Sequence, residues 1–232
     1  MGNTSTYFPE MDFDAVYRGE GPFPAPWDIA DPQPAFVLTE QLGGITGIVL
    51  DSGCGTGENA LYLADRGYSV TGLDAAPTAI EKARNKAAER GVEVTFEVAN
   101  ALELERYADS FDTVVDSALA HIFDVPTLRR YAASLHLACR PDARVYLLAI
   151  NDAGQEVMTT RFTDAMTKSG RPDAAADRLA AAIPRKHAEE LRIGFAEDWR
   201  LESLEKTVMR TMLPPGPGYV EIGAWLGCFR RI

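Results

Sequence analysis

Cysteine and histidine are scarce in this chain of 232 residues, which holds three of each. The cysteines are odd in number, and no two of them have the CxxC spacing. The sequence therefore predicts neither a disulfide framework nor a zinc site, and we expect no metal. Unpaired cysteines are typical of a reducing compartment, which favours a cytoplasmic location.

Basic residues are also few. Lys and Arg together number 23 against 34 Asp and Glu, which gives a formal charge of −11. Residues 1–60 hold nine acidic residues and a single basic one, Arg18. A nucleic-acid partner needs a stripe of basic side chains that neutralise phosphates. The charge pattern therefore argues against nucleic acid as a partner.

Long hydrophobic runs are missing as well. The longest unbroken apolar run is Val145–Ile150, whereas a membrane span needs roughly 20 such residues. The first 14 residues are acidic and polar, which is unlike a secretory signal. With 46% hydrophobic and 25% charged residues, the composition is typical of a globular protein. We expect one domain over residues 1–232 and no membrane partner.

Residues 1–34 are rich in proline and aromatic residues, including the stretch GPFPAPWDIADPQP. Proline at this density disfavours a regular helix or a central strand and predicts a stiff, extended segment. A free tail gains nothing by exposing large aromatic side chains, so Phe23 and Trp27 favour a segment laid across the domain. We call residues 1–40 the strap.

From residue 45 onwards, short apolar runs alternate with helical patterns. The helix predicted over Pro77–Arg90 has a proline in its first turn and Gly91 as its stop. Alternating strands and helices predict a parallel sheet with helices on both faces, which is the doubly wound α/β class. The strands expected are Ile45–Leu50, Tyr68–Leu73, Val92–Ala99, Phe111–Asp116 and Arg144–Ile150, and the other helices are Glu58–Arg66 and Thr127–Cys139.

The last third of the chain departs from this alternation. Residues 155–168 and 172–194 have helical patterns and are rich in alanine. Trp199–Met212 and Tyr219–Arg230 read as strands joined by a turn at PPGPG, so they predict an antiparallel hairpin. The expected sheet therefore has seven strands, mostly parallel, with the hairpin at its edge.

A glycine-rich turn follows the first predicted strand. Asp51 ends that strand, and Gly53, Gly55 and Gly57 follow before a helix begins. Alternating glycines let the backbone approach a ligand at the carboxyl edge of a parallel sheet. The G-x-G-x-G spacing differs from the dinucleotide pattern, and Glu58 opposes a diphosphate. Asp74, at the end of the next strand, is placed to accept hydrogen bonds from a ribose, so S-adenosylmethionine fits the pattern.

The sequence resembles class I S-adenosylmethionine-dependent methyltransferases in three segments over residues 27–230. These segments are DSGCGTGE with its partner Asp74, the pair Asn100-Ala101, and FDTVVDS. The resemblance implies a Rossmann-like fold, S-adenosylmethionine as cofactor and S-adenosylhomocysteine as product. The cofactor-binding residues that it implies are Trp27, Asp51, Gly53, Cys54, Gly55, Gly57, Asp74, Ala75, Asn100, Ala101, Asp116 and Ser117.

The strap sequence PWDIADPQP is similar to the corresponding strap of thiol, thiopurine and halide methyltransferases. Together with Asp116 and residues 117–123, it resembles bacterial enzymes that methylate heterocyclic toxins such as hydroxyquinolones. The resemblance implies methylation of O, N or S on a small heteroaromatic acceptor. We expect a monomer or homodimer. Residues 153–195 then form a helical lid over the acceptor pocket.

On the acceptor side, His121 is a candidate general base because it follows the fourth strand and titrates near neutrality. A purely structural histidine is the equal alternative. Asp116 is a second candidate, as a base or an electrostatic partner. Trp27 would shield the sulfonium through a cation–π contact. The other expected acceptor contacts are Tyr17, Phe23, Met158 and Phe162.

Two other functions stay open at this point. One is a nicotinamide-dependent oxidoreductase on a similar sheet, which the glycine spacing argues against. The other is a non-catalytic module that binds S-adenosylmethionine. Cys54 has no neighbouring base in the sequence, so we interpret it as a small filler in the loop rather than a nucleophile.

Overall fold

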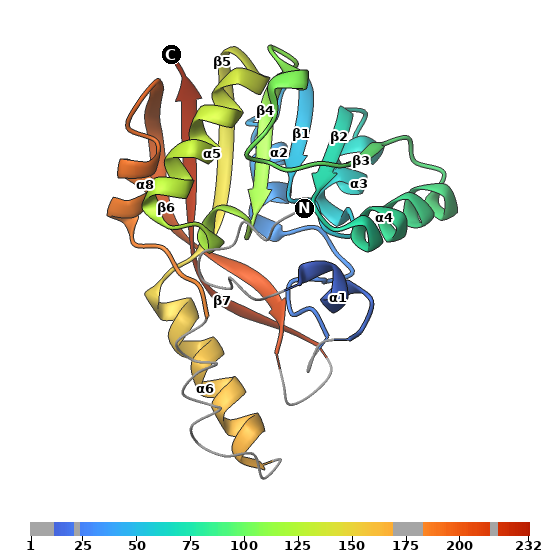
Figure 1. The fold of residues 1–232 in the computed structure, drawn as a ribbon, viewed down its shortest axis with the longest axis vertical. Coiled ribbons are helices and arrows are strands. Elements are labelled where there is room, and N and C mark those ends of the chain that lie inside the picture. The colour runs from blue at the N-terminus through green and yellow to red at the C-terminus, as the bar shows by residue number, and fades with distance from the viewer. Residues whose placement is uncertain (1–11, 21–23, 169–182, 214–217) are drawn as a thin grey trace.

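A computed structural model describes residues 12–20, 24–168, 183–213 and 218–232, and its centre is one twisted sheet (Figure 1). Seven strands form this sheet in the order β3-β2-β1-β4-β5-β7-β6. The strands are β1 Ile48–Ser52, β2 Ser69–Asp74, β3 Thr95–Val98, β4 Phe111–Ser117, β5 Cys139–Ile150, β6 Trp199–Met212 and β7 Tyr219–Arg231.

The pairing of the strands confirms the predicted fold class. Strands β1 to β5 pair in parallel, with Val49 opposite Val70 in β2 and Thr113 in β4. Strand β7 pairs antiparallel with both β5 and β6, with Val145 opposite Phe229. The predicted hairpin therefore closes one edge of a doubly wound, mostly parallel sheet.

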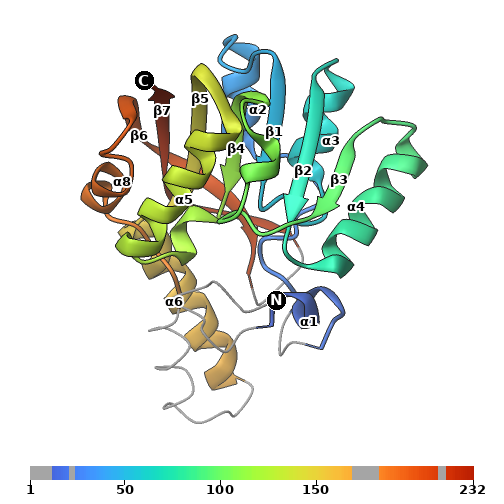
Figure 2. The same cartoon turned by 45° about the horizontal axis from the view of Figure 1, so that its top comes forward.

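Helices cover both faces of the sheet, because the chain runs from β1 out to β3 and then continues on the other side of β1 with β4 and β5. Right-handed crossovers in these two directions place their helices on opposite faces. Neighbouring residues of β1 show the two layers. Val49 is buried in a cluster with residues of helices α2, α3 and α4, and Leu50 in a second cluster with residues of α5 and α8 (Figure 2). The helices are α2 Pro34–Gln41, α3 Glu58–Asp65, α4 Pro77–Arg90, α5 Val125–Ala138 and α8 Ala188–Gly194.

Helices α1 (Phe13–Tyr17) and α6 (Asp152–Lys168) lie beyond the edge of the sheet where β4 ends (Figure 1). Gly154 of α6 packs on Gly223 of β7 so closely that a Cβ atom at Gly154 would lie 2.1 Å from the Gly223 carbonyl oxygen. Both helices therefore border the edge where ligands bind in open parallel sheets. Among the described residues, no helix is long and apolar enough to cross a membrane.

The strap is less extended than the sequence suggested. Its described part holds α1, a segment without proline, and α2, which has Pro34 in its first turn, where the missing N–H costs nothing. The prediction that proline density prevents helices in residues 1–34 was therefore wrong for α1. In the predicted helix over residues 172–194, residues 183–187 are not helical and α8 occupies only the last seven residues. Residues 169–182 lie outside the described ranges.

Candidate functional site

The glycine loop, residues 53–57, joins β1 to α3. Gly53, Gly55 and Gly57 have φ angles of 72°, 54° and 90°, a left-handed region that other residues occupy only at a cost. A Cβ atom at Gly53 would lie 2.9 Å from the side chain of Leu119, and one at Gly55 would lie 2.8 Å from the hydroxyl of Tyr17. The loop is therefore enclosed by the segment after β4 and by the strap.

Asp74 fixes the loop to the end of β2. Its Oδ2 accepts a hydrogen bond from the Gly55 N–H at 2.9 Å, and its Oδ1 accepts one from the Ala76 N–H at 2.8 Å. Burial raises the pKa of this carboxyl group above its usual value. Each carboxylate oxygen has a second lone pair, so the group keeps acceptor capacity for ligand hydroxyls.

Asp51 carries an unsatisfied acceptor beside the same loop. The residue is fully buried, and its Oδ2 accepts a hydrogen bond from the Ala60 N–H at 3.1 Å. Its Oδ1 is buried without a hydrogen-bond partner among the described residues. Burial raises the pKa of Asp51 to about 8. With this pKa the carboxyl group is mostly protonated near neutral pH, and a cationic amino group bound at Oδ1 would stabilise its ionised form and give that oxygen a partner.

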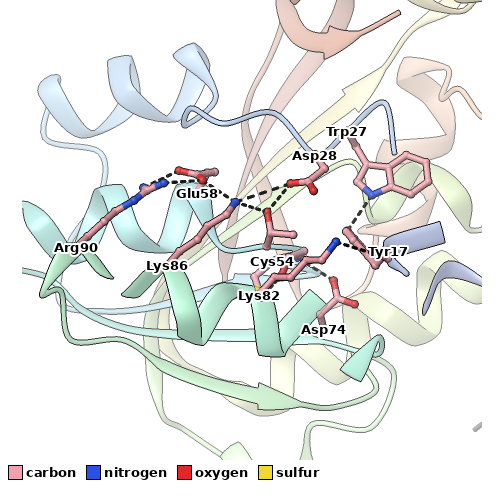
Figure 3. A network of polar contacts seen from close by, with 11 residues as sticks. Tyr17, Trp27, Asp28, Cys54, Glu58, Asp74, Lys82, Lys86 and Arg90 are labelled. Atoms are coloured by element: carbon pink, nitrogen blue, oxygen red, sulfur yellow. Dashed lines mark hydrogen bonds and ion pairs between the residues drawn. The ribbon is translucent and has the colours of Figure 1, made fainter. Parts of the chain in front are cut away.

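The strap covers the loop through two aromatic side chains (Figure 3). Trp27 Nε1 donates a hydrogen bond to the Tyr17 hydroxyl at 2.8 Å, and Tyr17 is only 6% exposed. Helix α1 is held on α4 by two further bonds. Asp14 accepts one from the Thr78 N–H at 2.7 Å, and Lys82 Nζ donates one to the Tyr17 carbonyl at 2.6 Å. These contacts place Trp27 and Tyr17 next to the glycine loop, and their role in covering a cofactor stays a prediction.

Asn100, Ala101 and Ala75 lie where β3 and β2 end. Asn100 Oδ1 accepts a hydrogen bond from the Leu102 N–H at 3.1 Å, and Nδ2 donates one to Glu103 at 3.0 Å. Ala75 is exposed and follows Asp74 directly. The structure thus brings these three residues to the same edge of the sheet as the glycine loop. Their contact with adenine stays a prediction.

Cys54 is buried inside the loop. Burial raises the pKa of its thiol well above the usual value, so the group stays protonated near neutral pH. A Cβ atom at Gly72 would lie 3.1 Å from the Cys54 sulfur. The side chain therefore fills space between β1 and β2, which suits a filler and not a nucleophile.

Asp116 at the end of β4 uses its carboxylate within the fold. Its oxygens accept hydrogen bonds from the N–H groups of Leu119 and Ala120 and from the Tyr131 hydroxyl, at 2.9–3.2 Å. Burial raises its pKa to about 7. The group holds the turn that leads into the short 3₁₀ helix η2, Ala120–Ile122. This bonding favours a structural role over the catalytic one that we predicted. Its neighbour Ser117 is half-buried.

His121 lies in η2 and is also buried. Its Nδ1 accepts a hydrogen bond from the Ile150 N–H at 3.3 Å, so the ring proton must reside on Nε2. Burial, with a smaller contribution from the nearby Lys186 ammonium, lowers the pKa of His121 to about 3. A neutral ring whose free lone pair is already bonded does not suit a general base. The structure fits the alternative reading of a structural histidine.

The expected acceptor contacts on α6 form one apolar stripe. Met158, Phe162 and Met166 are 6%, 6% and 5% exposed. Met158 and Phe162 belong to a cluster that includes Met209 of β6 and Ile183. The helix is confirmed, and the contact of its residues with an acceptor stays a prediction. Phe23 lies outside the described residues.

Three charged side chains beside the loop were not predicted from the sequence, namely Lys82, Lys86 and Arg90, and the role of a fourth, Glu58, was misinterpreted (Figure 3). Glu58 is 7% exposed and pairs with Lys86 at 2.7 Å and with Arg90 at 2.8 Å. Burial raises the pKa of Glu58, but hydrogen bonds from Arg90 and Lys86 outweigh it and lower the pKa below its usual value. Its negative charge is therefore compensated, which weakens the argument that it repels a diphosphate. Lys82 and Lys86 carry no local sequence signal that marks them.

Comparisons with known proteins agree with this geometry. A family profile described as "Methyltransferase domain" matches residues 49–142. The chain is 42% identical over 146 residues to the 2-heptyl-1-hydroxyquinolin-4(1H)-one methyltransferase of Mycobacteroides abscessus, a match that covers 61% of this chain and 64% of that enzyme. The chain thus spans somewhat less than two thirds of that relative.

Two solved structures are similar over most of the chain. The first is 50% identical, with a TM-score of 0.85, and the match covers 94% of this chain and 91% of the other. It is described by the words "Conversion of a Disulfide Bond into a Thioacetal Group during Echinomycin Biosynthesis". The other is a SAM-dependent methyltransferase from Anabaena variabilis, at 16% identity, 100% and 99% coverage and a TM-score of 0.72. The second similarity supports the fold alone.

Proposed function

The chain belongs to the S-adenosylmethionine-dependent methyltransferases, and on that premise we propose that it methylates an O, N or S atom of a small heteroaromatic acceptor. S-adenosylmethionine is the methyl donor, and S-adenosylhomocysteine is the product. We further propose that it acts as a single domain in the cytoplasm, as a monomer or homodimer.

The observation that carries the proposal is the bonding of the glycine loop to Asp74. The carboxylate orders the loop through the Gly55 N–H and keeps lone pairs for the ribose hydroxyls. The unpaired oxygen of Asp51 is suited to the amino group of the methionine part. Together these residues fit a nucleoside that carries a positive charge, which supports S-adenosylmethionine over a dinucleotide.

Methyl transfer from a sulfonium needs no help for the leaving group, so the protein contributes orientation and exclusion of water. The bound cofactor supplies the electrophilic methyl group. In this chain the glycine loop and Asp74 would hold the cofactor, and Tyr17 and Trp27 would cover it. The aromatic face of Trp27 offers the sulfonium a cation–π contact worth roughly 0.5–2 kcal/mol.

The bonding of His121 and Asp116 bears on the class of acceptor. Both groups, which the sequence marked as possible bases, are hydrogen-bonded within the fold. This supports an acceptor whose nucleophilic lone pair is available at neutral pH without help from these residues. An ionised N-hydroxy heterocycle or a sulfur atom meets that requirement, and the names of the hydroxyquinolone and thioacetal relatives point to the same two chemistries.

The test is methyl transfer from labelled S-adenosylmethionine to a panel of acceptors, read by mass spectrometry. The panel contains hydroxyquinolones, phenols, heteroaromatic amines, thiols, a cyclic disulfide and iodide. Methylation of an N-hydroxy heterocycle or of sulfur would support the proposal and identify the acceptor atom. Methylation of heteroaromatic amines alone would keep the heteroaromatic acceptor but contradict the choice of an N-hydroxy heterocycle or sulfur. Methylation of phenols alone would contradict both.

Calorimetry in the same buffer separates the two alternative functions. Binding of S-adenosylhomocysteine without binding of NAD would exclude the oxidoreductase. Binding of S-adenosylhomocysteine with no product from any acceptor would favour the non-catalytic module.

A further inference from the structure

A row of alternating charges joins helix α4 to the strap across the glycine loop (Figure 3). Lys86 is at its centre. The Lys86 Nζ atom lies 2.7 Å from Thr56 Oγ1, 2.7 Å from Glu58 Oε1 and 4.0 Å from Asp28 Oδ1. Arg90 closes the row with two hydrogen bonds to Glu58, at 2.8 and 2.9 Å. One ammonium group thus contacts the loop, the first turn of α3 and the strap.

The hydroxyl group of Thr56 connects the glycine loop to the strap. Thr56 is 4% exposed and lies in the middle of the glycine loop, between Gly55 and Gly57. Its Oγ1 accepts a hydrogen bond from Lys86 and donates one to Asp28 Oδ1. A hydroxyl group has a single proton, so a bond received from an ammonium directs that proton to the other neighbour. Lys86 therefore fixes the bond that Thr56 makes to the strap.

The strap contacts the loop at two successive residues. Asp28 accepts the hydrogen bond from Thr56, and Trp27 holds the Tyr17 hydroxyl beside Gly55. Because these residues are adjacent in the chain, the Thr56–Asp28 bond and the aromatic cover cannot shift independently. We call Lys86, Thr56 and Asp28 the latch.

We propose that Lys86 is a positioning residue for the cofactor: through Thr56 and Asp28 it holds the strap over the glycine loop and slows the release of bound S-adenosylmethionine and S-adenosylhomocysteine. The inference rests on the proposed placement of the cofactor on that loop. Lys86 acts through Thr56 and is assigned no contact with the reacting atoms.

The first experiment is calorimetry of S-adenosylhomocysteine with the Lys86→Met variant. Loss of the charged hydrogen bond is expected to weaken binding about tenfold. The KM for S-adenosylmethionine should rise by a similar factor, while kcat at saturation stays close to the wild-type value. The matched control is Arg84→Met, because Arg84 lies on the same helix and bonds the Phe96 carbonyl of β3 at 3.1 Å. The control should bind the product as tightly as the wild type does.

A double-mutant cycle tests whether Lys86 acts through the strap. Asp28→Asn and Lys86→Met should each weaken binding, and the double variant should lose much less than the product of the two factors. Lys86→Arg should recover most of the affinity, since its guanidinium also donates to Thr56 and Glu58. Additive losses in the cycle, or no recovery with arginine, would contradict the latch.

A spectroscopic signal reports on the strap without any turnover. The chain holds three tryptophans, so labelling with 5-fluorotryptophan gives three ¹⁹F resonances, and Trp27→Phe identifies the one from the strap. Lys86→Met should shift or broaden the Trp27 resonance and leave those of Trp199 and Trp225 in place. An unchanged Trp27 signal in Lys86→Met, with unchanged binding of S-adenosylhomocysteine, would overturn this inference and leave the proposed function standing. Failure of the wild-type protein to bind S-adenosylhomocysteine would contradict the proposed function as well.

Discussion

The hydroxyl group of Tyr17 lies 2.8 Å from the point where a side chain at Gly55 would begin. The strap and the glycine loop therefore meet with no room for even one methyl group. The contact is held from both sides. Trp27 bonds the Tyr17 hydroxyl, and Asp74 bonds the Gly55 N–H. Loop conformation and strap position are consequently coupled at one point, beside the proposed cofactor site.

Substitution of Gly55 by alanine tests this contact. Its φ of 54° should cost about 1–2 kcal/mol of stability in any residue with a Cβ atom, and the methyl group should also displace Tyr17. We expect lower stability in denaturant unfolding together with weaker binding of S-adenosylhomocysteine. Gly91→Ala is the control, because Gly91 has a φ of 65° and nothing within 4 Å of the added Cβ. Gly91→Ala should lose similar stability but bind S-adenosylhomocysteine as tightly as the wild type. Equal affinity of Gly55→Ala and Gly91→Ala for this ligand would argue against the contact.

Asp74→Ala should weaken binding of S-adenosylmethionine by about 1–3 kcal/mol, since it leaves ribose hydroxyls without an acceptor. It also removes the acceptor for the Gly55 and Ala76 N–H groups, so the loop should lose order. Calorimetry measures the affinity directly. An affinity close to that of the wild type would mean that Asp74 does not hold the ribose.

His121→Asn should leave turnover and cofactor affinity near their wild-type values, because the Asn Oδ1 can replace Nδ1 as acceptor for the Ile150 N–H. A histidine that acted as general base would instead lose most of its turnover in this variant. Steady-state kinetics with the acceptor found in the panel decide between the two roles.

The same histidine should make the protein acid-labile. The pKa of His121 is about 3 in the fold, against about 6.5 in the unfolded chain. Its contribution to stability is therefore complete above pH 6.5 and is lost as the pH falls from 6.5 towards 3. Between pH 7.5 and pH 5, urea unfolding of the wild type should lose about 2 kcal/mol more than that of His121→Asn. Parallel losses would contradict the lowered pKa.

Gly154→Ala tests how α6 is held on the sheet. The added Cβ atom would lie 2.1 Å from the Gly223 carbonyl oxygen, and this is a backbone atom that cannot rotate away. We expect a loss of about 1–3 kcal/mol in stability from overpacking. If α6 covers the acceptor, the KM for the acceptor should rise while the affinity for S-adenosylhomocysteine stays constant. A change in cofactor affinity would place the role of α6 elsewhere.

Much of the fold can be predicted from local sequence signals such as proline, glycine and the alternation of apolar residues. Helix α4 runs over Pro77–Arg90 as predicted, because proline and Gly91 mark its two ends. Strand β6 has the predicted bounds Trp199–Met212, set by alternation and by the turn after it. Helix α1 has a start signal in its N-cap Asp12, which accepts a hydrogen bond from the Ala15 N–H at 3.1 Å, but it has no proline in its first turn. Its five residues are too few for a helix that is stable on its own, and its bonds to Thr78 and Lys82 on α4 hold it in place.

The site divides in the same way. Local spacing predicted the glycine loop and Asp74, since the ends of neighbouring parallel strands meet at one edge. The role of His121 depends on the Ile150 N–H, 29 residues away, and on burial. The role of Lys86 depends on a hydroxyl 30 residues away in the loop. Neither contact can be predicted from the residues that neighbour His121 or Lys86 in the sequence.

Strand β7 comes after β6 in the chain but lies between β5 and β6 in the sheet. During synthesis, β5 therefore cannot pair on its second side until residues 219–231 have been made. Strand β6 has no partner in the sheet before then either. The cofactor half, β1 to β4, can form earlier from pairs that are already made. Helix α6 packs on β7 through Gly154 and Gly223, so this contact cannot form until residues 219–231 have been made. On the proposed assignment, the strands that carry the cofactor loop are therefore complete in the chain before the strand that holds α6 is made.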